Sequence, residues 1–522
     1  MKRLNPATAF VALGMAGLAA SAIAAPPPRT ARSATVDARN LPLVRTIDER
    51  FMSFQVGFSH LTGGETWKSY DELQQGAAER GGFAAIREAR APTDLANPRL
   101  RTLTKALGPL YLRYSGTTAN SVYFHDSDAP LPAKPPAGFT IALTREAWKG
   151  AVDFAKAVDG KILTSFANSE GVRDASHAWT PKMAAPWLAY TRSVGGEIYA
   201  AELFNEPNAP EPPRIPQGHS PEAFARDFAT FRAFMSQAAP NVKLAGPGNA
   251  VLGVPVFVKS LDTISPEQYA TATPTPKFDI VSYHFYPALA ERCAKPDAAE
   301  GISVDKALNE DWLARPDKQI QRFTALRDRH APGAPVWLTE TGGAACGGLR
   351  WQPTFLDAFR FVDTHARSAK QGLDAIFTHA LISGSNGVID EKTFQPNASY
   401  WGALLWKRLI GSKVLDAGSL KPGLHVYAHC LRGTPGGVAM IALNLEDSPA
   451  RIRATSPARL YALTAPEPQS RTVLLNGRRL ELGRGDALPA LNPLRVNGGT
   501  VSLARSSINF IALPQAANRN CA

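Results

Sequence analysis

Acidic residues and cysteine are scarce in this 522-residue chain. It has 45 Asp and Glu residues against 57 Lys and Arg, which gives a formal net charge of +12 at pH 7. A basic balance of this size favours polyanionic partners such as acidic polysaccharides, anionic membranes or nucleic acid, although charge that serves only solubility gives the same count. The four cysteines are too few for a disulfide-rich scaffold, but they are even in number and can pair in an exported protein.

Several catalytic signatures are missing as well. The sequence has no metal-ligand spacing, no glycine-rich phosphate loop and no Gly-x-Ser-x-Gly elbow, which disfavours serine hydrolases and nucleotide-dependent enzymes. We therefore expect neither a metal nor a cofactor. Beyond the N-terminus no apolar run reaches the roughly 20 residues that a membrane-spanning helix needs, and no internal repeat is present.

The N-terminus predicts export. Lys2 and Arg3 precede an apolar stretch at residues 7–20, and Ala22-Ile23-Ala24 provides a small-x-small cleavage site. We therefore expect residues 1–24 to be a cleaved signal peptide, with a retained membrane anchor as the weaker alternative. The mature protein is then secreted or periplasmic, without stable membrane insertion.

Short apolar runs alternate with helical patterns between residues 51 and 383. Eight runs are candidate strands: Phe51–Phe58, Leu110–Tyr114, Ile162–Ala167, Ile198–Phe204, Val242–Ala245, Ile280–His284, Val336–Thr339 and Ala375–His379. Eight strands that are each followed by a helix predict an α/β fold of the (β/α)8 TIM barrel type, with a doubly wound sheet as the alternative. We place this catalytic barrel at residues 47–411, closed by a helix at Ser399–Ile410.

The pattern changes after Gly411. Short β-rich runs such as Leu424–Cys430, Gly437–Leu443 and Ser506–Leu513 are separated by Gly, Pro and Asn, which is typical of an antiparallel sandwich. We therefore expect a C-terminal antiparallel β-sandwich domain over residues 412–522. The N-terminal segment, residues 25–46, is a candidate for one further strand of it, at Ala34–Ala38.

Two glutamates stand where buried strands end. Glu206 follows the fourth candidate strand in Asn205-Glu206-Pro207, and Glu340 follows the seventh. Barrel enzymes place catalytic groups at the carboxyl ends of their strands, and strands four and seven lie across the barrel from each other. The two carboxylates can therefore face each other over a bound sugar, as in a glycoside hydrolase with one acid/base and one nucleophile or base. The alternative is that Glu206 is an ordinary loop glutamate.

Further side chains near these strand ends are candidate sugar contacts. The amide of Asn205 can hydrogen-bond a sugar 2-hydroxyl. His284 and Tyr286, after strand six, can donate to a carboxylate or to the sugar. The glycine-rich loop around Cys346-Gly347-Gly348 exposes backbone N–H groups that suit a substrate carboxylate, although glycine pairs are also common in plain loops.

Other polar residues compete for these roles. Glu202 precedes Glu206 by four residues in a strand, so we expect it to point the same way but deeper, as an interior partner. Glu170, after strand three, is the best spare carboxylate. His379, at strand eight, is expected to be a satisfied interior histidine rather than a catalyst.

Five segments carry a resemblance to a known family. They are Tyr111-Leu112-Arg113-Tyr114-Ser115-Gly116-Thr117, Asn205-Glu206-Pro207-Asn208, Val336-Trp337-Leu338-Thr339-Glu340-Thr341, Tyr400-Trp401 through Gly411-Ser412-Lys413-Val414-Leu415, and Leu424-His425-Val426-Tyr427-Ala428-His429-Cys430. On these segments the chain resembles the heparanases and their bacterial relatives in glycoside hydrolase family 79. The resemblance covers nearly the whole mature chain. It implies a retaining β-glucuronidase on a (β/α)8 barrel with a β-sandwich, with Glu206 as the acid/base and Glu340 as the nucleophile.

The resemblance also implies roles for substrate-binding residues. The positions that match the family's pocket are Thr117, Asn205, His284, Tyr286, Cys346, Gly347 and Gly384, with Gly348 next to them. An acidic sugar-binding residue of the family appears here as Gly57. A lysine that follows the acid/base in the family has no counterpart, and Arg214 is the nearest cation.

The resemblance further implies a disulfide between Cys430 and Cys521. For Cys293 and Cys346, on the loops after strands six and seven, a disulfide across the cleft rim and two free thiols both stay open. No Lys or Arg stands among the positions that match the family's pocket, so we expect hydrogen bonds from the loop of Cys346 and from Tyr286 to bind the uronate carboxylate.

These observations predict a retaining endo-β-glucuronidase that acts on heparan sulfate-like acidic glycans. Arg214, Arg292 and Lys295 are candidate surface cations for the sulfates of such a glycan. An exo-β-glucuronidase of the same family is the nearest alternative, and a non-catalytic binder of acidic glycans is the second. Nucleic acid is not an expected partner, and the oligomeric state stays open.

Overall fold

The computed structural model describes residues 32–73, 82, 84–209, 215–253, 264–294, 301–454 and 456–522. The expected signal peptide lies outside the described residues, as do Arg214 and Lys295. No helix within the described ranges has the length and apolar character to cross a membrane.

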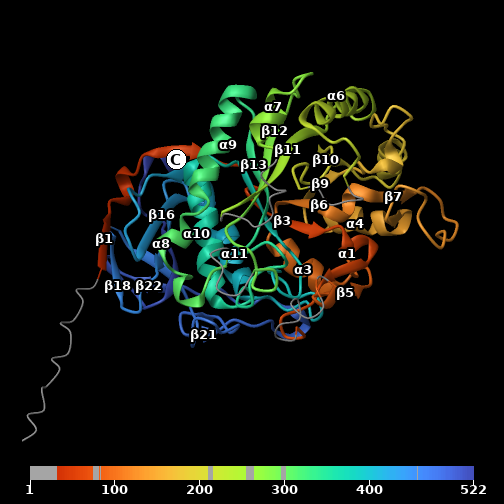
Figure 1. Cartoon of the computed structure of the whole chain (residues 1–522). Helices are drawn as coiled ribbons and strands as arrows, with labels where there is room; N and C mark the ends of the chain where they lie inside the picture. The colour runs from red at the N-terminus through yellow and green to blue at the C-terminus, as the bar shows by residue number, and fades with distance from the viewer. Residues whose placement is uncertain are drawn as a thin grey trace, which may run out of the picture.

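Eight parallel strands form a closed barrel (Figure 1). In chain order they are β3 (Met52–Gly57), β6 (Leu110–Ser115), β9 (Gly160–Ser165), β10 (Ile198–Glu202), β11 (Lys243–Leu252), β12 (Ile280–Tyr286), β13 (Val336–Thr341) and β14 (Ala375–His379). The predicted TIM barrel is confirmed, and the doubly wound alternative is wrong because β14 pairs with β3 and closes the sheet.

Strand β11 is longer than the sequence indicated. The run Gly246-Pro247-Gly248 reads as a turn, yet the strand continues through it to Leu252. The register against β12 shifts between Pro247 and Asn249, so the proline lies at a bulge. A proline is tolerated there because a bulge already interrupts the hydrogen-bond ladder.

Helices cover the outside of the barrel. The longer ones are α3 (Pro98–Ala106), α4 (Arg145–Ala157), α5 (Ala184–Ser193), α6 (Pro221–Ala238), α9 (Asp317–His330), α10 (Phe355–Gln371) and α11 (Ala398–Leu409). Local signals set their starts: Thr144 caps α4, and Ser220 caps α6 with a proline in its first turn. Helices α10 and α11 are almost wholly buried, because they lie between the barrel and the C-terminal sheet (Figure 1).

The barrel interior has an apolar layer and a polar layer. Tyr111, Trp337 and Phe377 pack together with small residues of the other strands, and the rings of Tyr111 and Trp337 lie 4.7 Å apart between centroids. Because alternate strand residues share a face, the next inward positions after Tyr111 and Ala200 are Arg113 and Glu202. Both of these charged side chains are buried, closer to the carboxyl ends of the strands.

The remaining strands form a two-layered sandwich. The larger sheet contains β2 (Leu43–Thr46), β15 (Ile410–Leu415), β16 (Leu424–Leu431), β17 (Val438–Asn444), β24 (Ser507–Leu513) and β19 (Ala458–Thr464), and the smaller contains β1 (Arg32–Val36), β18 (Ala450–Ala454) and β23 (Gly499–Leu503). Val36, Ile452 and Val501 of the small sheet pack against Met440 and Ile511 of the large one.

The N-terminal segment contributes to both sheets. Strand β1 pairs with β18 in parallel, and β2 pairs with β15, a second strand that the sequence did not indicate. Strand β1 ends at Val36, earlier than the expected Ala38, because the 3-10 helix Ala38–Asn40 follows. Helix α11 ends at Leu409 and β15 begins at Ile410, so the chain passes directly from the last barrel helix into the sandwich.

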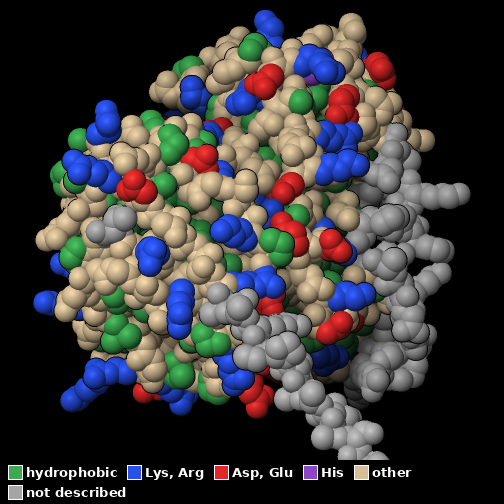
Figure 2. Space-filling view, turned by 90° about the vertical axis from the view of Figure 1, so that its left-hand side faces the viewer, with side chains coloured by type: hydrophobic (Ala, Val, Ile, Leu, Met, Phe, Trp, Pro, Cys, Tyr) green, Lys and Arg blue, Asp and Glu red, His purple; other side chains and the backbone are tan. Residues whose placement is uncertain are grey.

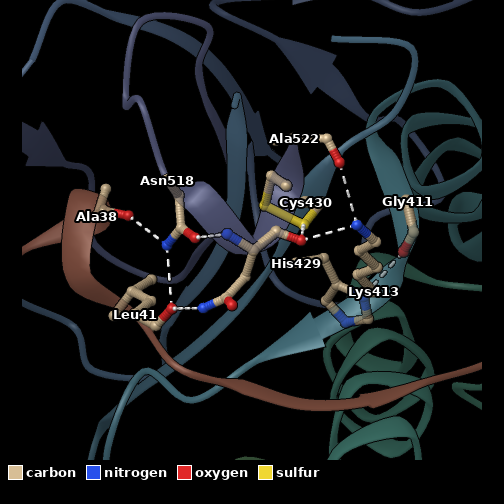
Figure 3. Close-up of a disulfide and its surroundings, with 10 residues drawn as sticks. Ala38, Leu41, Gly411, Lys413, His429, Cys430, Asn518 and Ala522 are labelled. Carbon is tan, nitrogen blue, oxygen red and sulfur yellow. Dashed lines mark hydrogen bonds between the residues drawn. A yellow bond between two sulfur atoms is a disulfide. The ribbon is translucent and has the colours of Figure 1, made fainter. Parts of the chain in front are cut away.

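The C-terminal tail is fastened to the sandwich (Figure 3). Cys430 of β16 and Cys521 form a disulfide, with Cα atoms 5.3 Å apart, which confirms the expected pair. The side chain of Asn518 donates to the carbonyls of Ala38 and Leu41, at 2.8 and 3.0 Å. The tail therefore joins β16 to the N-terminal segment.

The excess positive charge has no single location on the face shown in Figure 2. Lys and Arg side chains are scattered over this face, with fewer Asp and Glu between them. The net charge alone therefore does not identify a binding surface.

Candidate active site

A cavity of about 380 Å³ opens at the carboxyl ends of the barrel strands, within the usual range of small-ligand sites. Glu206 and Glu340 line it, together with Tyr286, His379 and Thr117. Ligand sites of TIM barrels lie at this end because the loops after the strands converge there.

Glu206 stands in the turn that follows β10. Its backbone has φ +50°, an uncommon left-handed conformation for a residue other than glycine. Neighbouring residues hold this turn: the Asn208 side chain makes two 2.8 Å hydrogen bonds with the backbone of Ala250, and the Tyr269 hydroxyl donates to the carbonyl of Pro207 at 2.8 Å. Backbone strain that the surroundings enforce is typical of functional sites, and here it orients the Glu206 carboxylate.

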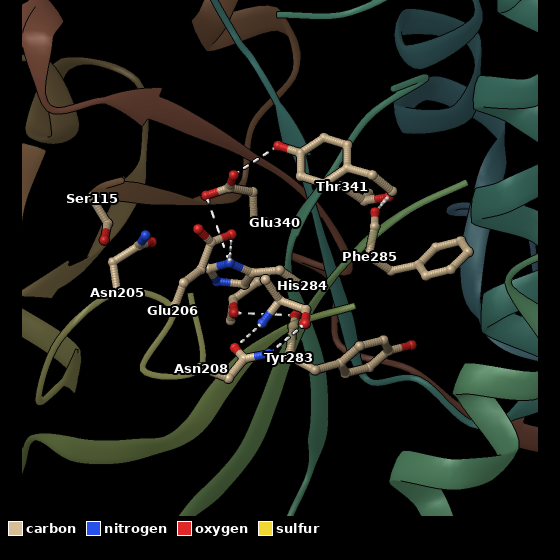
Figure 4. Close-up of polar contacts among 12 residues, drawn as sticks. Ser115, Asn205, Glu206, Asn208, Tyr283, His284, Phe285, Glu340 and Thr341 are labelled. Carbon is tan, nitrogen blue, oxygen red and sulfur yellow. Dashed lines mark hydrogen bonds and ion pairs between the residues drawn. The ribbon is translucent and has the colours of Figure 1, made fainter. Parts of the chain in front are cut away.

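His284 links the two glutamates (Figure 4). Its Nδ1 lies 2.9 Å from Oε1 of Glu206 and 3.9 Å from Oε2 of Glu340. The His284 side chain is fully buried, whereas the Glu206 side chain is 18% exposed, so the histidine supports the carboxylate from behind and leaves it facing the cavity. The sequence left two roles open for His284, contact with a carboxylate or with the sugar. This geometry matches contact with a carboxylate.

Glu340 accepts hydrogen bonds on both carboxylate oxygens. The Tyr286 hydroxyl donates to Oε1 at 2.7 Å, and Nη1 of Arg113 donates to Oε2 at 2.8 Å. Burial by itself raises the pKa of Glu340, but the charges of His284, His379 and Arg113 and the Tyr286 hydrogen bond outweigh it and hold the pKa well below its ordinary value. Glu340 is therefore an ionised carboxylate at neutral pH, as a nucleophile has to be.

Arg113 is the centre of the polar layer beneath the cavity. It is completely buried, and Nε and Nη2 donate to Oε2 of Glu202 at 3.1 and 2.8 Å. Nη1 also donates to Gln55 at 2.7 Å, and Nη2 donates to Oδ1 of Asn205 at 2.8 Å. Glu202 is thus the interior partner that the sequence indicated, and one guanidinium fixes Glu340 and the residue before Glu206 together.

The spacing of the two glutamates limits the reaction type. Carboxylate oxygens of Glu206 and Glu340 and Nδ1 of His284 all lie within 4.8 Å of one another. Such a trio can also hold a metal ion, but both oxygens of Glu340 already accept hydrogen bonds from protein donors. The donor set therefore suits a carboxylate pair that works on a sugar better than a metal centre.

Asn205 and Thr117 lie where a sugar contact is possible. The amide oxygen of Asn205 accepts from Arg113, and its backbone is bonded to the side chain of Asn120. Its amide nitrogen has no partner among the described residues, so it stays available as a donor. Thr117 begins the short 3-10 helix after β6 and lines the cavity.

The loop Cys346-Gly347-Gly348 has an uncommon backbone conformation. All three residues have positive φ, +66°, +79° and +82°. None of their backbone N–H groups donates to another described residue, and Cys346 and Gly347 line the cavity. Gly347 cannot be replaced easily, because a Cβ there would lie 2.6 Å from the ring of Trp67. Gly348 is buried, and its carbonyl accepts from the Tyr70 hydroxyl.

The Tyr286 hydroxyl, which we expected to bind a uronate carboxylate together with the loop of Cys346, is already engaged. The Tyr286 hydroxyl has a single proton, and it is donated to Glu340. Tyr286 therefore positions the carboxylate of the enzyme rather than binding the carboxylate of a sugar. The site thus requires another donor if its ligand is an anion.

Cys293 and Cys346 are free thiols. They lie against each other, since a hydrogen bond from one thiol to the other lowers the pKa of Cys293 and raises that of Cys346. Backbone hydrogen bonds between Ala290 or Ala288 and Ala345 bring the two loops together. Of the two alternatives, the structure has free thiols at the rim.

Gly384 is not among the residues that line the cavity, and a Cβ there would meet the Glu391 carboxylate at 2.8 Å, so its contact with a sugar stays a prediction. Two other expectations about individual residues are wrong. His379 is no satisfied interior residue, because it forms part of the cavity wall and its Nδ1 has no partner. Arg292 is no surface cation: it is 4% exposed and lies 3.9 Å over the ring of Tyr70. Glu170, the spare carboxylate, lies away from the cavity lining and accepts from the backbone of Gln217.

Sequence reasoning missed Arg113, Gln55 and Arg87. A signal existed for the first two, since Arg113 and Gln55 are polar residues in the middle of otherwise apolar strands, where a charged group has to have a partner. Arg87 gave no such signal, because it lies outside every motif and reaches the cavity only through the fold.

Comparison with known proteins agrees with this site. No family model matches the chain. Heparanase-like protein 1 of Arabidopsis thaliana is 25% identical over 81% of this chain and 85% of its own length. Heparanase of Mus musculus is 25% identical, over 83% and 89%. Baicalin-β-D-glucuronidase of Scutellaria baicalensis is 28% identical over 46% of each chain. The protein is a glycoside hydrolase that resembles the heparanases.

Solved structures agree on the fold. A 4-O-α-L-rhamnosyl-β-D-glucuronidase from Fusarium oxysporum superimposes with a TM-score of 0.59 at 16% identity, covering 92% of this chain and 100% of its own. An arabinofuranosidase from Xanthomonas axonopodis has a TM-score of 0.59 at 15% identity, covering 92% and 98%. At this identity the two matches support the architecture of barrel and sandwich and carry no information on the substrate.

Proposed function

We propose that this protein is a retaining endo-β-glucuronidase that hydrolyses β-glucuronosyl linkages in heparan sulfate-like acidic glycans by double displacement. The names of the relatives support the substrate class, since they are heparanases and a β-D-glucuronidase. The arrangement of Glu206 and Glu340 supports the chemistry.

The separation of the two glutamates carries the proposal of retention. Retaining glycosidases have carboxyl groups about 5–5.5 Å apart, whereas inverting enzymes need roughly 6.5–9.5 Å to hold a water molecule between carboxylate and sugar. Oxygens of Glu206 and Glu340 lie within 4.8 Å of each other. This spacing fits direct attack of one carboxylate on the anomeric carbon.

The surroundings of the two groups distinguish their roles. Glu340 is ionised and fixed by Tyr286 and Arg113, so it attacks the anomeric carbon and forms the glycosyl-enzyme. Among the described residues Glu206 has only His284 as a side-chain partner at hydrogen-bond distance, and it is more exposed, so it protonates the leaving oxygen. In the second step the Glu206 carboxylate takes a proton from water, which attacks the same carbon and releases Glu340.

Two variants separate these roles. Glu206→Ala is expected to retain the first step on an aryl β-D-glucuronide with a good leaving group, and azide is expected to restore turnover as a β-glucuronosyl azide. Glu340→Ala is expected to lose both steps, and azide is not expected to give the β-product. Proton NMR of the first product formed by the unmodified protein tests retention, and an α-configured product contradicts the double displacement.

Endo action is the part of the proposal that depends most on the relatives. An exo-β-glucuronidase is the second candidate, because one relative is named a β-D-glucuronidase rather than a heparanase. Size analysis of heparan sulfate digests distinguishes them: endo action gives oligosaccharides, and exo action gives free uronic acid. A protein that binds heparan sulfate but turns over neither this polymer nor an aryl β-glucuronide is the non-catalytic alternative.

We also propose that the protein is exported, on the basis of the charged and apolar pattern of residues 1–24. N-terminal sequencing of the protein purified from its native cells tests this. A mature chain that still begins at Met1 contradicts cleavage.

A further inference from the structure

One wall of the cavity is formed by residues that belong to none of the sequence motifs. A hairpin of β4 (Gly64–Trp67) and β5 (Arg87–Arg90) pairs Trp67 with Arg87. Glu65, Trp67 and Arg87 line the cavity on the same side as Cys346 and Gly347. The Trp67 ring sits directly on Gly347, where a Cβ would lie 2.6 Å from it. The hairpin is therefore packed against the loop Cys346-Gly347-Gly348.

Arg87 is held in place over this ring. Its guanidinium carbon lies 4.8 Å from the centroid of the Trp67 ring, within the range of a cation–π contact. It also lies close enough to Cys346 for its charge to act on the thiol. The planar face of the guanidinium is thus used by Trp67, while its edge, which carries the N–H donors, is not.

The donors of Arg87 are largely unused. The Arg87 side chain makes no hydrogen bond to any described residue, and its Nε is buried without an acceptor. The nearest carboxylate is that of Glu65, 3.6 Å from Nε, on a side chain that is 70% exposed. A pair of this kind is weak, because water screens the exposed carboxylate. Because the Arg87 side chain is only 21% exposed, water satisfies few of its donors either.

The balance of charges in the cavity also indicates that Arg87 can bind an anionic ligand. Glu206, Glu340 and Glu65 all line it, and Arg87 is the single Lys or Arg among the described residues that do. An anionic sugar that enters this cavity meets repulsion from the ionised carboxylate of Glu340. A guanidinium offsets this repulsion, and its fork of N–H groups matches the two oxygens of a carboxylate.

We propose that Arg87 is the ionic partner of the substrate's uronate carboxylate, which it holds together with the N–H groups of Cys346 and Gly347. This inference rests on the proposed β-glucuronidase function and deepens it. Arg87 is then a specificity-determining residue that selects glucuronides over the corresponding glucosides. The expectation that hydrogen bonds alone bind the carboxylate at this position is thereby replaced.

The test compares Arg87→Met with the unmodified protein on two substrates, an aryl β-D-glucuronide and the matching β-D-glucoside. We expect kcat/KM for the glucuronide to fall about 10- to 150-fold, the loss of a charge-assisted hydrogen bond, and kcat/KM for the glucoside to change less than about threefold. Arg87→Lys, which keeps the charge but not the fork, is expected to lie between the two. Because the small substrate carries no sulfate, a loss on it identifies the carboxylate as the ligand.

The matched control is Arg145→Met. Arg145 also lies over an aromatic ring, 5.3 Å from the centroid of Tyr190, but outside the cavity. It is expected to leave the ratio of the two kcat/KM values unchanged. A proportional loss on both substrates in Arg87→Met, or an unchanged ratio, overturns the inference and leaves the proposed function standing.

A binding measurement separates this inference from the proposed function. Calorimetric titration with free glucuronate and with glucose is expected to show tighter binding of glucuronate, and Arg87→Met is expected to abolish the difference. If the unmodified protein binds glucuronate through Arg87 but hydrolyses no glucuronide, the proposed function is wrong and the inference stands. Equal binding of both sugars by the unmodified protein refutes the inference.

Discussion

Arg113 carries the positive charge of the barrel interior, so its replacement by methionine tests how Glu340 is kept ionised. Methionine matches the length of the arginine stem but supplies no donor. In Arg113→Met two buried carboxylates, Glu202 and Glu340, lose their shared cation. Breaking a buried ion pair by removal of one partner costs about 3–5 kcal/mol, because the remaining charge stays buried without compensation. We expect a loss of this size in the free energy of unfolding at pH 7.

The pH dependence of that loss has a definite sign. The pKa of Glu340 lies below its ordinary value of 4.5 in the folded protein, so the group contributes stability above about pH 4.5 and loses it as the pH falls toward the folded-state pKa. In Arg113→Met the pKa of Glu340 rises, and this contribution is missing. The difference in stability between the two proteins is therefore largest at neutral pH. It narrows as the pH falls through the raised pKa of Glu340 in the variant, by up to about 1.4 kcal/mol per pH unit for this carboxylate.

Two assays measure the effect. Urea unfolding followed by tryptophan fluorescence at pH 7, 5 and 4 gives the stability difference, and kcat/KM for an aryl β-glucuronide against pH gives the acid limb. We expect the acid limb to move to higher pH in Arg113→Met, because Glu340 protonates more easily. Arg173→Met is the control, since Arg173 is also a buried arginine, paired with Asp227 at 2.5 Å, but it lies outside the cavity lining.

The control is expected to lose stability without moving the acid limb. An acid limb in Arg113→Met that coincides with that of the unmodified protein contradicts the account, whatever the loss of stability. A stability difference that stays constant between pH 7 and 4 contradicts it as well.

Two further predictions concern single interactions. Removal of the disulfide in Cys430→Ala/Cys521→Ala is expected to lower the free energy of unfolding by about 4.6 kcal/mol in the chain-entropy model, because the bond closes a loop with a sequence separation of 91. Chemical denaturation under non-reducing conditions measures this, and an unfolding free energy equal to that of the unmodified protein argues against it. Tyr286→Phe removes the 2.7 Å hydrogen bond to Glu340, worth about 1.5–3 kcal/mol for a charged acceptor, so the pKa of Glu340 and the acid limb of kcat/KM are expected to rise. In Tyr114→Phe, which loses only a bond to the carbonyl of Ala151, an equal shift would show that the effect is not specific.

The barrel and the placement of the two glutamates followed from local patterns. Apolar runs bounded by Gly and Pro are buried strands wherever they pack, so eight of them at barrel spacing were sufficient to predict the fold. All parallel strands of a barrel end on one face. Residues directly after two of these runs, Glu206 and Glu340, therefore had to meet at that face although they are far apart in the sequence. The pairing of Cys430 with Cys521 came from family resemblance rather than from any local pattern.

Side-chain partners within the site were decided only by the tertiary structure. Arg113 and Tyr286 each donate to a different carboxylate oxygen of Glu340. This choice depends on the stagger of the strands and on side-chain rotamers, and the spacing of residues in the sequence predicts neither. Burial also depends on segments remote in the sequence, since Arg292 is withdrawn from water by Tyr70, a residue of another loop.

Arg87 is the clearest example of a cavity residue that the sequence alone does not predict. It lies in a polar segment without a motif, and only the hairpin that folds back over Gly347 brings its guanidinium into the cavity. The sequence by itself thus determined which backbone elements form and which of their ends converge, because these depend on local periodicity. The tertiary structure decided which charges face one another there, because that depends on contacts between residues that no local pattern connects.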